Sequence, residues 1–302
     1  MKKVTVLMST YNGEKYIREQ IESILQQEQV EVQLIVRDDG SKDDTLKIIT
    51  ECGGGRIQVI EGSNLGPVLS FMELIDEADI NTDYFAFADQ DDIWMPDKLA
   101  RAAEMIEQTG KKCVLYASNQ TVADQDGNAL HERYHADPPV DLLNIIDSNW
   151  MAGCTMVFDK ELMQILQSHQ PDPGFIQTRM HDTWVAAVAA CVGTIVYDSE
   201  SRMLYRQHTD NVVGSEKGSL AERISARIRM KKDAQGGAYH LTFANELDRV
   251  FPEAIKKEAR YVIRLYQNTD SLRGKIGFLA SRYFQKRYYR SKFSFALKLL
   301  FG

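Results

Sequence analysis

Short apolar runs alternate with segments of helical periodicity from the beginning of this sequence. An apolar run at residues 4–8 is followed by Ile17, Ile21 and Ile24, which share one helical face, and by a second run at 32–36. Further strands are predicted at 57–60, 84–88 and 113–117, and helices at 44–50, 68–78 and 98–108. This alternation predicts an α/β fold with a mostly parallel sheet flanked by helices.

Past residue 130 the pattern loosens, and it later becomes purely helical. Residues 124–128 have hairpin-turn chemistry, and 131–139 predict a surface loop. Order returns at 154–158, and we predict helices at 160–167 and 183–190 with strands at 194–197 and 203–206. From residue 220 we predict only helices, interrupted at Pro252, Gly236-Gly237 and Gly274 to Gly277. A boundary near 213–218 separates an α/β domain at 1–215 from a helical, basic C-terminal region at 216–302.

Charge is divided unequally along the chain. The net charge of -7 combines about -19 in residues 1–222 with about +12 in 223–302. After Asp270 there are eight Lys and Arg and no Asp or Glu, interleaved with aromatic and aliphatic residues. Two interpretations stay open: a peripheral attachment to an anionic membrane surface, or helices that pack on the body or on a second subunit as a homodimer. The acidic body disfavours nucleic acid as a partner.

Neither a membrane span nor a secretion signal is predicted. The longest apolar-leaning run, residues 184–197, is shorter than the ~20 residues that cross a bilayer. The first residues, Met1-Lys2-Lys3, lead into no apolar signal core. We therefore expect a cytoplasmic protein, with attachment to the inner face of the cell membrane as the peripheral alternative.

Three polar clusters follow predicted strands: residues 9–13, 38–41 and 89–92. The carboxyl ends of parallel strands form the ligand-binding edge of such a sheet. Asp38 and Asp39 are neighbours on an extended strand, so only one of them faces a given pocket, where it can accept hydrogen bonds from a nucleobase or ribose. The alternative is that this segment only caps the next helix through Ser41 or Asp43.

Asp89, Asp91 and Asp92 place three carboxylates within four residues. Such a cluster repels itself unless a cation lies between its members, and carboxylates with a substrate diphosphate are typical ligands of Mg²⁺ or Mn²⁺. A solvated acidic turn before the helix at Pro96 is the alternative.

These segments together resemble the signatures of family 2 glycosyltransferases of the GT-A fold, with a Rossmann-like nucleotide-binding half, and the bacterial rhamnosyltransferase branch in particular. The resemblance covers about residues 1–214. The motifs that carry it are Ser9 to Gly13, Asp38 to Thr45, Asn64-Leu65-Gly66, Asp89 to Lys98, Gly153 to Met156, His181 to Trp184 and Tyr205 to Gly214.

The resemblance implies a role for each matching position. Asp182 falls at the general base, and His181 departs from relatives that carry an acidic residue there. Asp91 would bind the metal. The nucleotide contacts are Ser9, Tyr11, Asp39, Asn64, Gly66 and Asp89, and Asp89 and His208 complete the metal set with Asp91.

Chemistry supports the same roles. Sugar transfer from a nucleoside diphosphate to a hydroxyl needs a base and a cation at the leaving group, and one positioned carboxylate, Asp182, predicts inversion. Asp182 as a helix cap and His208 as a structural residue are the alternatives. Arg206 is predicted to pair with phosphate. Trp184 and Trp94 are predicted to stack on the acceptor, with a place in the core as their alternative.

Three functions follow as hypotheses. The first is a metal-dependent inverting transferase that moves L-rhamnose from dTDP-β-L-rhamnose to a glycan or lipid-linked acceptor in bacterial cell-surface and cell-wall polysaccharide biosynthesis. The second is the same fold with a UDP-hexose or UDP-N-acetylhexosamine donor. The third is a non-catalytic nucleotide-sugar-binding subunit of a polysaccharide assembly complex.

Overall fold

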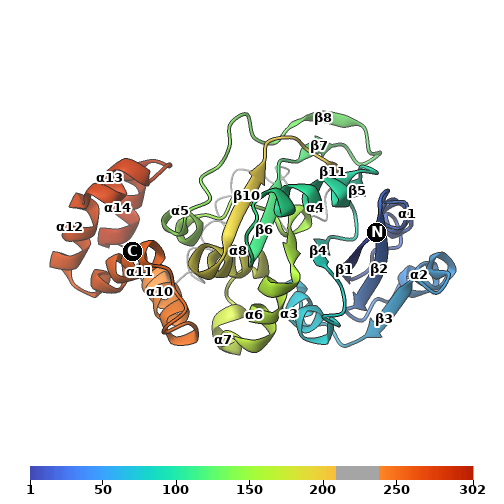
Figure 1. Ribbon diagram of the computed structural model, residues 1–302, viewed down its shortest axis with the longest axis horizontal. Helices are drawn as coiled ribbons and strands as arrows, with labels where there is room; N and C mark the ends of the chain where they lie inside the picture. Colours follow the sequence, from blue (N-terminus) through green and yellow to red (C-terminus); the bar gives the residue numbers. More distant parts are fainter. Residues whose placement is uncertain (209–237, 302) are drawn as a thin grey trace.

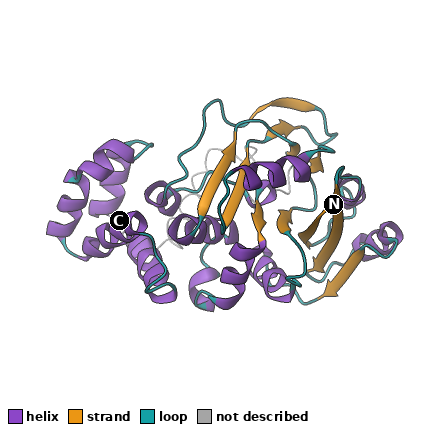
Figure 2. Cartoon of the chain, in the orientation of Figure 1, coloured by secondary structure: helices purple, strands orange, loops and turns teal. Residues whose placement is uncertain are grey.

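A seven-stranded sheet forms the centre of the molecule (Figure 2). The computed structural model describes residues 1–208 and 238–301. Strand order is β10-β6-β9-β4-β1-β2-β3, and every neighbouring pair is parallel except those that include β9. The strands are β1 (Lys2–Thr10), β2 (Val30–Asp38), β3 (Ile57–Glu61), β4 (Tyr84–Ala88), β6 (Val114–Ser118), β9 (Val157–Asp159) and β10 (Thr194–Asp198).

Helices cover both faces of this sheet and create two cores. Val6 and Leu7 are adjacent and fully buried, yet they belong to different apolar clusters because side chains alternate along a strand. The cluster of Val6 includes side chains of α1 (Ile17–Leu25), α2 (Thr45–Gly53) and α4 (Lys98–Gln108). The cluster of Leu7 includes those of α3 (Pro67–Glu77), α5 (Leu142–Asp147), α6 (Lys160–Ser168), α7 (Pro173–Ile176) and α8 (His181–Val192). The predicted α/β fold, a mostly parallel sheet flanked by helices, is confirmed.

A smaller four-stranded sheet lies beside the large one, in the order β5-β11-β7-β8. Its hairpin turn at 124–128 is confirmed, with the Gly127 N–H donating to the Asp124 carbonyl at 3.1 Å. The strands are β5 (Ile93–Trp94), β7 (Thr121–Ala123), β8 (Ala129–Glu132) and β11 (Met203–Arg206). The short strand β5 was not predicted, because two residues give no periodicity.

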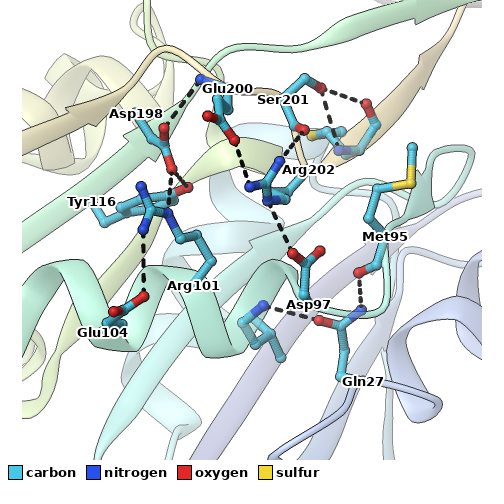
Figure 3. Close-up of polar contacts among 12 residues, drawn as sticks. Gln27, Met95, Asp97, Arg101, Glu104, Tyr116, Asp198, Glu200, Ser201 and Arg202 are labelled. Atoms are coloured by element: carbon cyan, nitrogen blue, oxygen red, sulfur yellow. Dashed lines mark hydrogen bonds and ion pairs between the residues drawn. The ribbon is translucent and has the colours of Figure 1, made fainter.

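Polar contacts hold the connection from β10 to β11 against α4 (Figure 3). Arg101 Nε donates to Asp198 at 3.0 Å, and Arg202 forms ion pairs with Asp97 at 3.1 Å and with Glu200 at 2.6 Å. The backbone N–H of Met95 donates to the carbonyl of Arg202 at 2.9 Å. This network fixes where β11 begins and therefore where the residues after the strand lie.

The C-terminal helices pack directly on the body of the molecule. The Tyr266 hydroxyl donates to the Leu143 carbonyl at 2.8 Å, and the Lys256 N–H donates to the Cys191 carbonyl at 2.9 Å. The predicted packing on the body is thus seen, whereas the predicted boundary at 213–218 lies outside the described residues. The helices are α10 (Ala238–Val250), α11 (Lys257–Gln267), α12 (Leu272–Ala280), α13 (Arg282–Arg287) and α14 (Lys292–Phe301), and they form the left end of the molecule in Figure 1.

Three local predictions from the sequence can be compared directly with the structure. The break predicted at Gly274 to Gly277 is wrong, because α12 runs through both glycines and is capped at its start by Ser271. The break at Pro252 is confirmed, since α10 ends at Val250. The ordered segment expected at 154–158 consists of a 3-10 turn, Gly153–Thr155, and the antiparallel β9. No helix within residues 1–208 and 238–301 is long and apolar enough to cross a membrane.

Candidate active site

The site lies where the strand order reverses, between β1 and β4. Such a reversal opens a crevice at the carboxyl ends of the strands. Gln90, in the loop after β4, connects this loop to the end of β1. Its Oε1 accepts from Thr10 Oγ1 at 2.6 Å and from the Tyr11 N–H at 2.9 Å. A Cβ at Gly13 would lie 2.5 Å from Gln90 Oε1, so a larger residue there would displace the Gln90 side chain. The predicted nucleoside residue Tyr11 stays 42% exposed at the edge of the site.

The ends of β2 and β3 meet around Asp39. Its carboxylate accepts from the backbone N–H of Leu65 and of Gly66, each at 2.8 Å, and pairs with the guanidinium of Arg37. Asp38 instead accepts from the N–H groups of its own turn, including that of Ser41 at 2.8 Å. The structure thus brings Asp39 and the segment at 64–66 together, as two predicted nucleotide contacts, and gives the neighbouring carboxylates separate partners.

Three carboxylates of the loop after β4 gather at the same edge. Burial, and then repulsion by Asp91, raise the pKa of Asp89 to about 7. Burial and its two acidic neighbours also raise the pKa of Asp92 well above the ordinary value. Asp92 Oδ2 is buried and accepts no hydrogen bond from any residue in the described part of the chain. A cluster with this excess of desolvated negative charge is well suited to hold a cation.

His208 reaches this loop from the segment after β11. Its Nε2 lies 2.7 Å from Asp91 Oδ2, and its ring packs at 4.8 Å from that of Tyr16. The structure thus brings His208 and Asp91 together, and the charge of Asp91 contributes to the raised pKa of Asp89, whereas a metal shared by the three stays a prediction. Carboxylate oxygens with one imidazole nitrogen fit a divalent cation such as Mn²⁺ or Mg²⁺.

Asp89 also belongs to a second group of potential metal ligands. Ligand atoms of Asp89, Asp92 and Cys154 all lie within 4.8 Å of one another. Burial and the two carboxylates raise the pKa of the Cys154 thiol well above its usual range, and its sulfur accepts from Gln120 Nε2 at 3.3 Å. A protonated thiol is a poor metal ligand. Asp89 and Asp92 supply the oxygen ligands of this group, and oxygen is the ligand type that Mg²⁺ and Mn²⁺ prefer.

Arg206 is directed at protein groups. Its Nε donates to the Asp91 carbonyl at 2.9 Å, its Nη1 donates to the Gln125 carbonyl at 2.8 Å, and its Nη2 pairs with Glu19 at 2.5 Å. The side chain is almost completely buried. In this structure Arg206 braces the acidic loop, and a contact between it and phosphate stays a prediction.

The first turn of α8 contributes His181 and Asp182. His181 is buried, with its ring stacked on Phe71 at 4.0 Å, and burial lowers its pKa to about 4, so it is neutral near pH 7. Neither ring nitrogen has a hydrogen-bond partner among the described residues. The half-buried Asp182 accepts from Thr183 Oγ1 at 3.2 Å, and its charge contributes to the raised pKa of Asp89. Asp182 thus belongs to the same electrostatic cluster as the acidic loop.

Asp182 does not cap the helix. Met180 occupies the N-cap position of α8, and no side chain donates or accepts a capping hydrogen bond there. The alternative role predicted for Asp182, a helix cap, is therefore wrong in this structure. The carboxylate remains available for chemistry, at the helix end where the macrodipole stabilises negative charge.

Both tryptophans predicted to stack on an acceptor are buried. Trp184 is 0% exposed and packs against Phe175, Phe243 and other core rings. Trp94 is 3% exposed, and the ammonium of Lys98 lies 3.5 Å from its ring centroid. The acceptor role predicted for Trp184 and Trp94 is wrong, because neither ring offers a free face.

Sequence reasoning missed Lys98 as part of the site. Its Nζ donates to the Cys154 carbonyl at 2.7 Å beneath Asp89 and Asp92, and burial lowers its pKa to about 8. The signal was present, because Lys98 occupies the buried face of α4 that it shares with Leu99 and Ala102. A charged residue on the apolar face of a helix requires a buried partner.

A cavity of about 260 Å³ lies further along the same sheet edge, at the carboxyl ends of β6 and β10. Tyr134 and Tyr197 line it together with the carboxylates of Glu132 and Asp137. Aromatic faces beside carboxylates suit a carbohydrate. No part of the cavity was predicted, because its lining combines the loop at 134–137 with residues at the ends of β6, β8 and β10 that are distant in the sequence.

Comparison with known proteins identifies the class to which this fold and site correspond. Residues 5–172 match the family model described as glycosyl transferase family 2. The chain belongs to this family. It is 32% identical over 218 residues to a dTDP-rhamnosyl transferase, RfbG, of Shigella flexneri, an alignment that covers 69% of this chain and 74% of RfbG.

More distant relatives share the architecture. An uncharacterized glycosyltransferase of Rickettsia prowazekii, RP339, is 25% identical over 226 residues, covering 72% of this chain and 68% of that protein. The crystal structure of S. aureus TarS 1-349 in complex with UDP-GlcNAc superposes with a TM-score of 0.56 at 17% identity, covering 91% of this chain and 83% of TarS. The GT-A architecture is thereby confirmed.

Proposed function

We propose that this glycosyltransferase is an inverting, metal-dependent rhamnosyltransferase that moves L-rhamnose from dTDP-β-L-rhamnose to a glycan or lipid-linked acceptor of a bacterial cell-surface polysaccharide. The observation that carries the proposal is the convergence of Asp182, the acidic loop at 89–92 and His208 at the switch point of the sheet. The choice of donor rests on the similarity to a dTDP-rhamnosyl transferase.

The donor's nucleotide would lie over the ends of β1, β2 and β3. Asp39 would accept a hydrogen bond from the imide N–H of the pyrimidine, with Ser9 and Tyr11 on one side and Asn64 and Gly66 on the other. Since Asp39 already orders the backbone at 65–66, the loop is shaped before the donor arrives. Preorganised contacts of this kind reduce the entropic cost of binding.

The diphosphate would lie at the acidic loop, where Asp91, Asp89 and His208 would hold Mg²⁺ or Mn²⁺. A divalent cation supplies charge neutralisation for the departing diphosphate. Lys98 is buried near the loop, and its charge opposes the rise in the pKa of Asp89 and of Asp92. Arg206 fixes the loop backbone through the Asp91 carbonyl.

Asp182 would take the proton of the acceptor hydroxyl as that oxygen attacks the anomeric carbon. The carbon–oxygen bond to the diphosphate breaks on the opposite face, so one displacement inverts the configuration. Two features of α8 support this role: Asp182 lies in the first turn of the helix, and its side chain makes no capping hydrogen bond. A non-catalytic sugar-binding subunit would have no need for a carboxylate at this position.

A second donor class has one observation in its favour. The TarS structures that share this fold are described in complex with UDP and with UDP-GlcNAc. A UDP-hexose or UDP-N-acetylhexosamine would use the same contacts, because a carboxylate at Asp39 recognises the imide that thymine and uracil share.

We propose that the acceptor binds in the cavity at the ends of β6 and β10, because the two tryptophans are buried. Tyr134 and Tyr197 offer rings, and Asp137 offers a hydrogen-bond acceptor, at the same edge as Asp182. We place the enzyme in the cytoplasm, peripheral at the inner face of the membrane where lipid-linked acceptors are extended.

A donor panel tests the function. The purified protein is incubated with Mn²⁺ and with dTDP-β-L-rhamnose, UDP-GlcNAc or UDP-glucose, and release of the nucleoside diphosphate is measured with and without candidate glycan acceptors. The proposal expects acceptor-dependent release of dTDP. Release of UDP alone would move the assignment to the second donor class, and release from none of the donors with any acceptor would contradict the transferase assignment.

A further inference from the structure

The last helix of the described chain, α14, has two apolar faces. Phe295 and Leu299 are buried, and Phe295 packs against the rings of Phe278 and Phe284 at 5.4 and 5.1 Å. On the opposite side of the helix, Phe293, Leu297 and Phe301 recur every four residues and are 74%, 45% and 82% exposed. Only one of the two faces is therefore used for packing within the protein.

The neighbouring helix α12 repeats this arrangement. Leu272 and Ile276 are four residues apart and 65% and 56% exposed, whereas Phe278 faces inward. We define the outer tail face as Leu272, Ile276, Phe293, Leu297 and Phe301. Single exposed apolar side chains are ordinary on proteins, but several large ones at helical spacing on two packed helices mark an interaction surface.

Charge indicates which partner fits this face. Residues 271–301 carry eight Lys and Arg and no Asp or Glu. A two-fold contact between two copies of this face would bring these cations against each other, which is unfavourable at an interface of low dielectric. A surface of negative charge that can also accept apolar side chains has the complementary chemistry, and an anionic lipid bilayer provides both.

We propose that the outer tail face docks on an anionic lipid bilayer. Its phenyl and aliphatic side chains enter the boundary between headgroups and acyl chains, and basic residues of the same helices, such as Lys275 and Lys292, meet the lipid phosphates. The proposed function enters this inference at one point only: docking on the membrane would bring the transferase to a lipid-linked acceptor. The binding itself needs no catalysis.

Vesicle flotation of the full-length protein tests the proposal. Vesicles of phosphatidylcholine with about 30% phosphatidylglycerol are compared with vesicles of phosphatidylcholine alone. We expect the protein to float with the anionic vesicles and to partition at least tenfold less onto the neutral ones, and about 0.5 M salt should weaken the binding by screening the charges.

A triple variant isolates the apolar contribution. Phe293→Ser with Leu297→Ser and Phe301→Ser should reduce partition onto anionic vesicles at least tenfold, because three buried apolar side chains are lost from the membrane contact. The matched control, Leu130→Ser with Val59→Ser, removes exposed apolar side chains far from the tail and should float like the wild type. Both proteins should unfold at the wild-type temperature, which separates lost binding from lost folding.

Specific outcomes would overturn the proposal. Wild-type protein that stays at the bottom of the gradient with anionic vesicles contradicts it, and so does a triple variant that floats as well as the wild type. A concentration-dependent dimer that the triple variant loses, without flotation, would assign the face to a second copy. Turnover of a water-soluble acceptor should be unchanged in the triple variant. Flotation therefore tests the membrane proposal, and turnover tests the transferase assignment independently of it.

Discussion

His208 Nε2 lies 2.7 Å from Asp91 Oδ2, although 117 residues separate them in the sequence. The contact exists because β11 pairs with β5, directly after the acidic loop, and because the network around Arg202 and Asp198 fixes the start of β11. An imidazole nitrogen and a carboxylate oxygen that lie this close together can both bind one divalent cation.

The proposed metal dependence can be tested at this pair. Asp91→Asn should abolish the stabilisation that Mn²⁺ and dTDP together give against thermal unfolding, and EDTA should do the same to the wild type. His208→Ala should weaken metal binding by about 10- to 100-fold, because one ligand is lost. Asp126→Asn, a carboxylate in an exposed turn, serves as the control and should respond like the wild type. An enzyme insensitive to EDTA would contradict the metal assignment.

Loss of the base should affect turnover rather than donor binding. Asp182→Asn keeps the size of the side chain but cannot accept a proton, so kcat should fall by roughly 10² to 10⁴ with little change in KM for the donor. Glu161→Gln is a matched control, since Glu161 lies in the first turn of α6 and away from the site. Wild-type turnover by Asp182→Asn would disprove its role as the base.

The packing of Gly153 against His181 offers a structural test of the site. A Cβ at position 153 would lie 2.6 Å from His181 Nε2, so Gly153→Ala should cost about 1–3 kcal/mol of unfolding free energy and reduce turnover by shifting the first turn of α8. In a His181→Ala background the same change should cost much less. Chemical denaturation of the four proteins of this double-mutant cycle measures the coupling, and purely additive costs would show that the two residues do not press on each other.

Acid stability should depend on Asp147, which joins α5 to the C-terminal helices. Burial alone would raise its pKa, but hydrogen bonds from His240 and Tyr288 outweigh burial and lower the pKa to about 2. Because the folded pKa lies below the unfolded one, about 2 kcal/mol of stability is present above pH 4 and is lost as pH falls toward 2.

Asp147→Asn should remove most of this acid-dependent loss. Denaturation of wild type and variant at several pH values between about 6 and 2 measures it, and the two stability curves should converge at the acid end. Parallel curves at all pH values would contradict the assignment of this pH dependence to Asp147.

The sequence predicted the sheet and its polar edge well, because strands and helices of the first 120 residues show regular apolar periodicity. It also predicted that Asp39 and Gly66 would share a site, through a resemblance to known motifs. Lys98 and Gln90 were missed because their partners, Cys154 and Thr10, are distant in sequence. Trp184 was misassigned because helical periodicity is lost in α8, where nearly every side chain is buried and both sides of the helix are apolar.

The central claim is that the site binds a nucleotide sugar together with a divalent cation, and thermal unfolding tests it most directly. Wild type and Asp91→Asn are heated with Mn²⁺ and with dTDP, dTDP-rhamnose, UDP or UDP-GlcNAc, where a ligand at 100 times its Kd adds about 2.7 kcal/mol of stability. The account predicts selective stabilisation of the wild type by dTDP and dTDP-rhamnose, lost with EDTA and in the variant. An unfolding temperature that no nucleotide raises would contradict it.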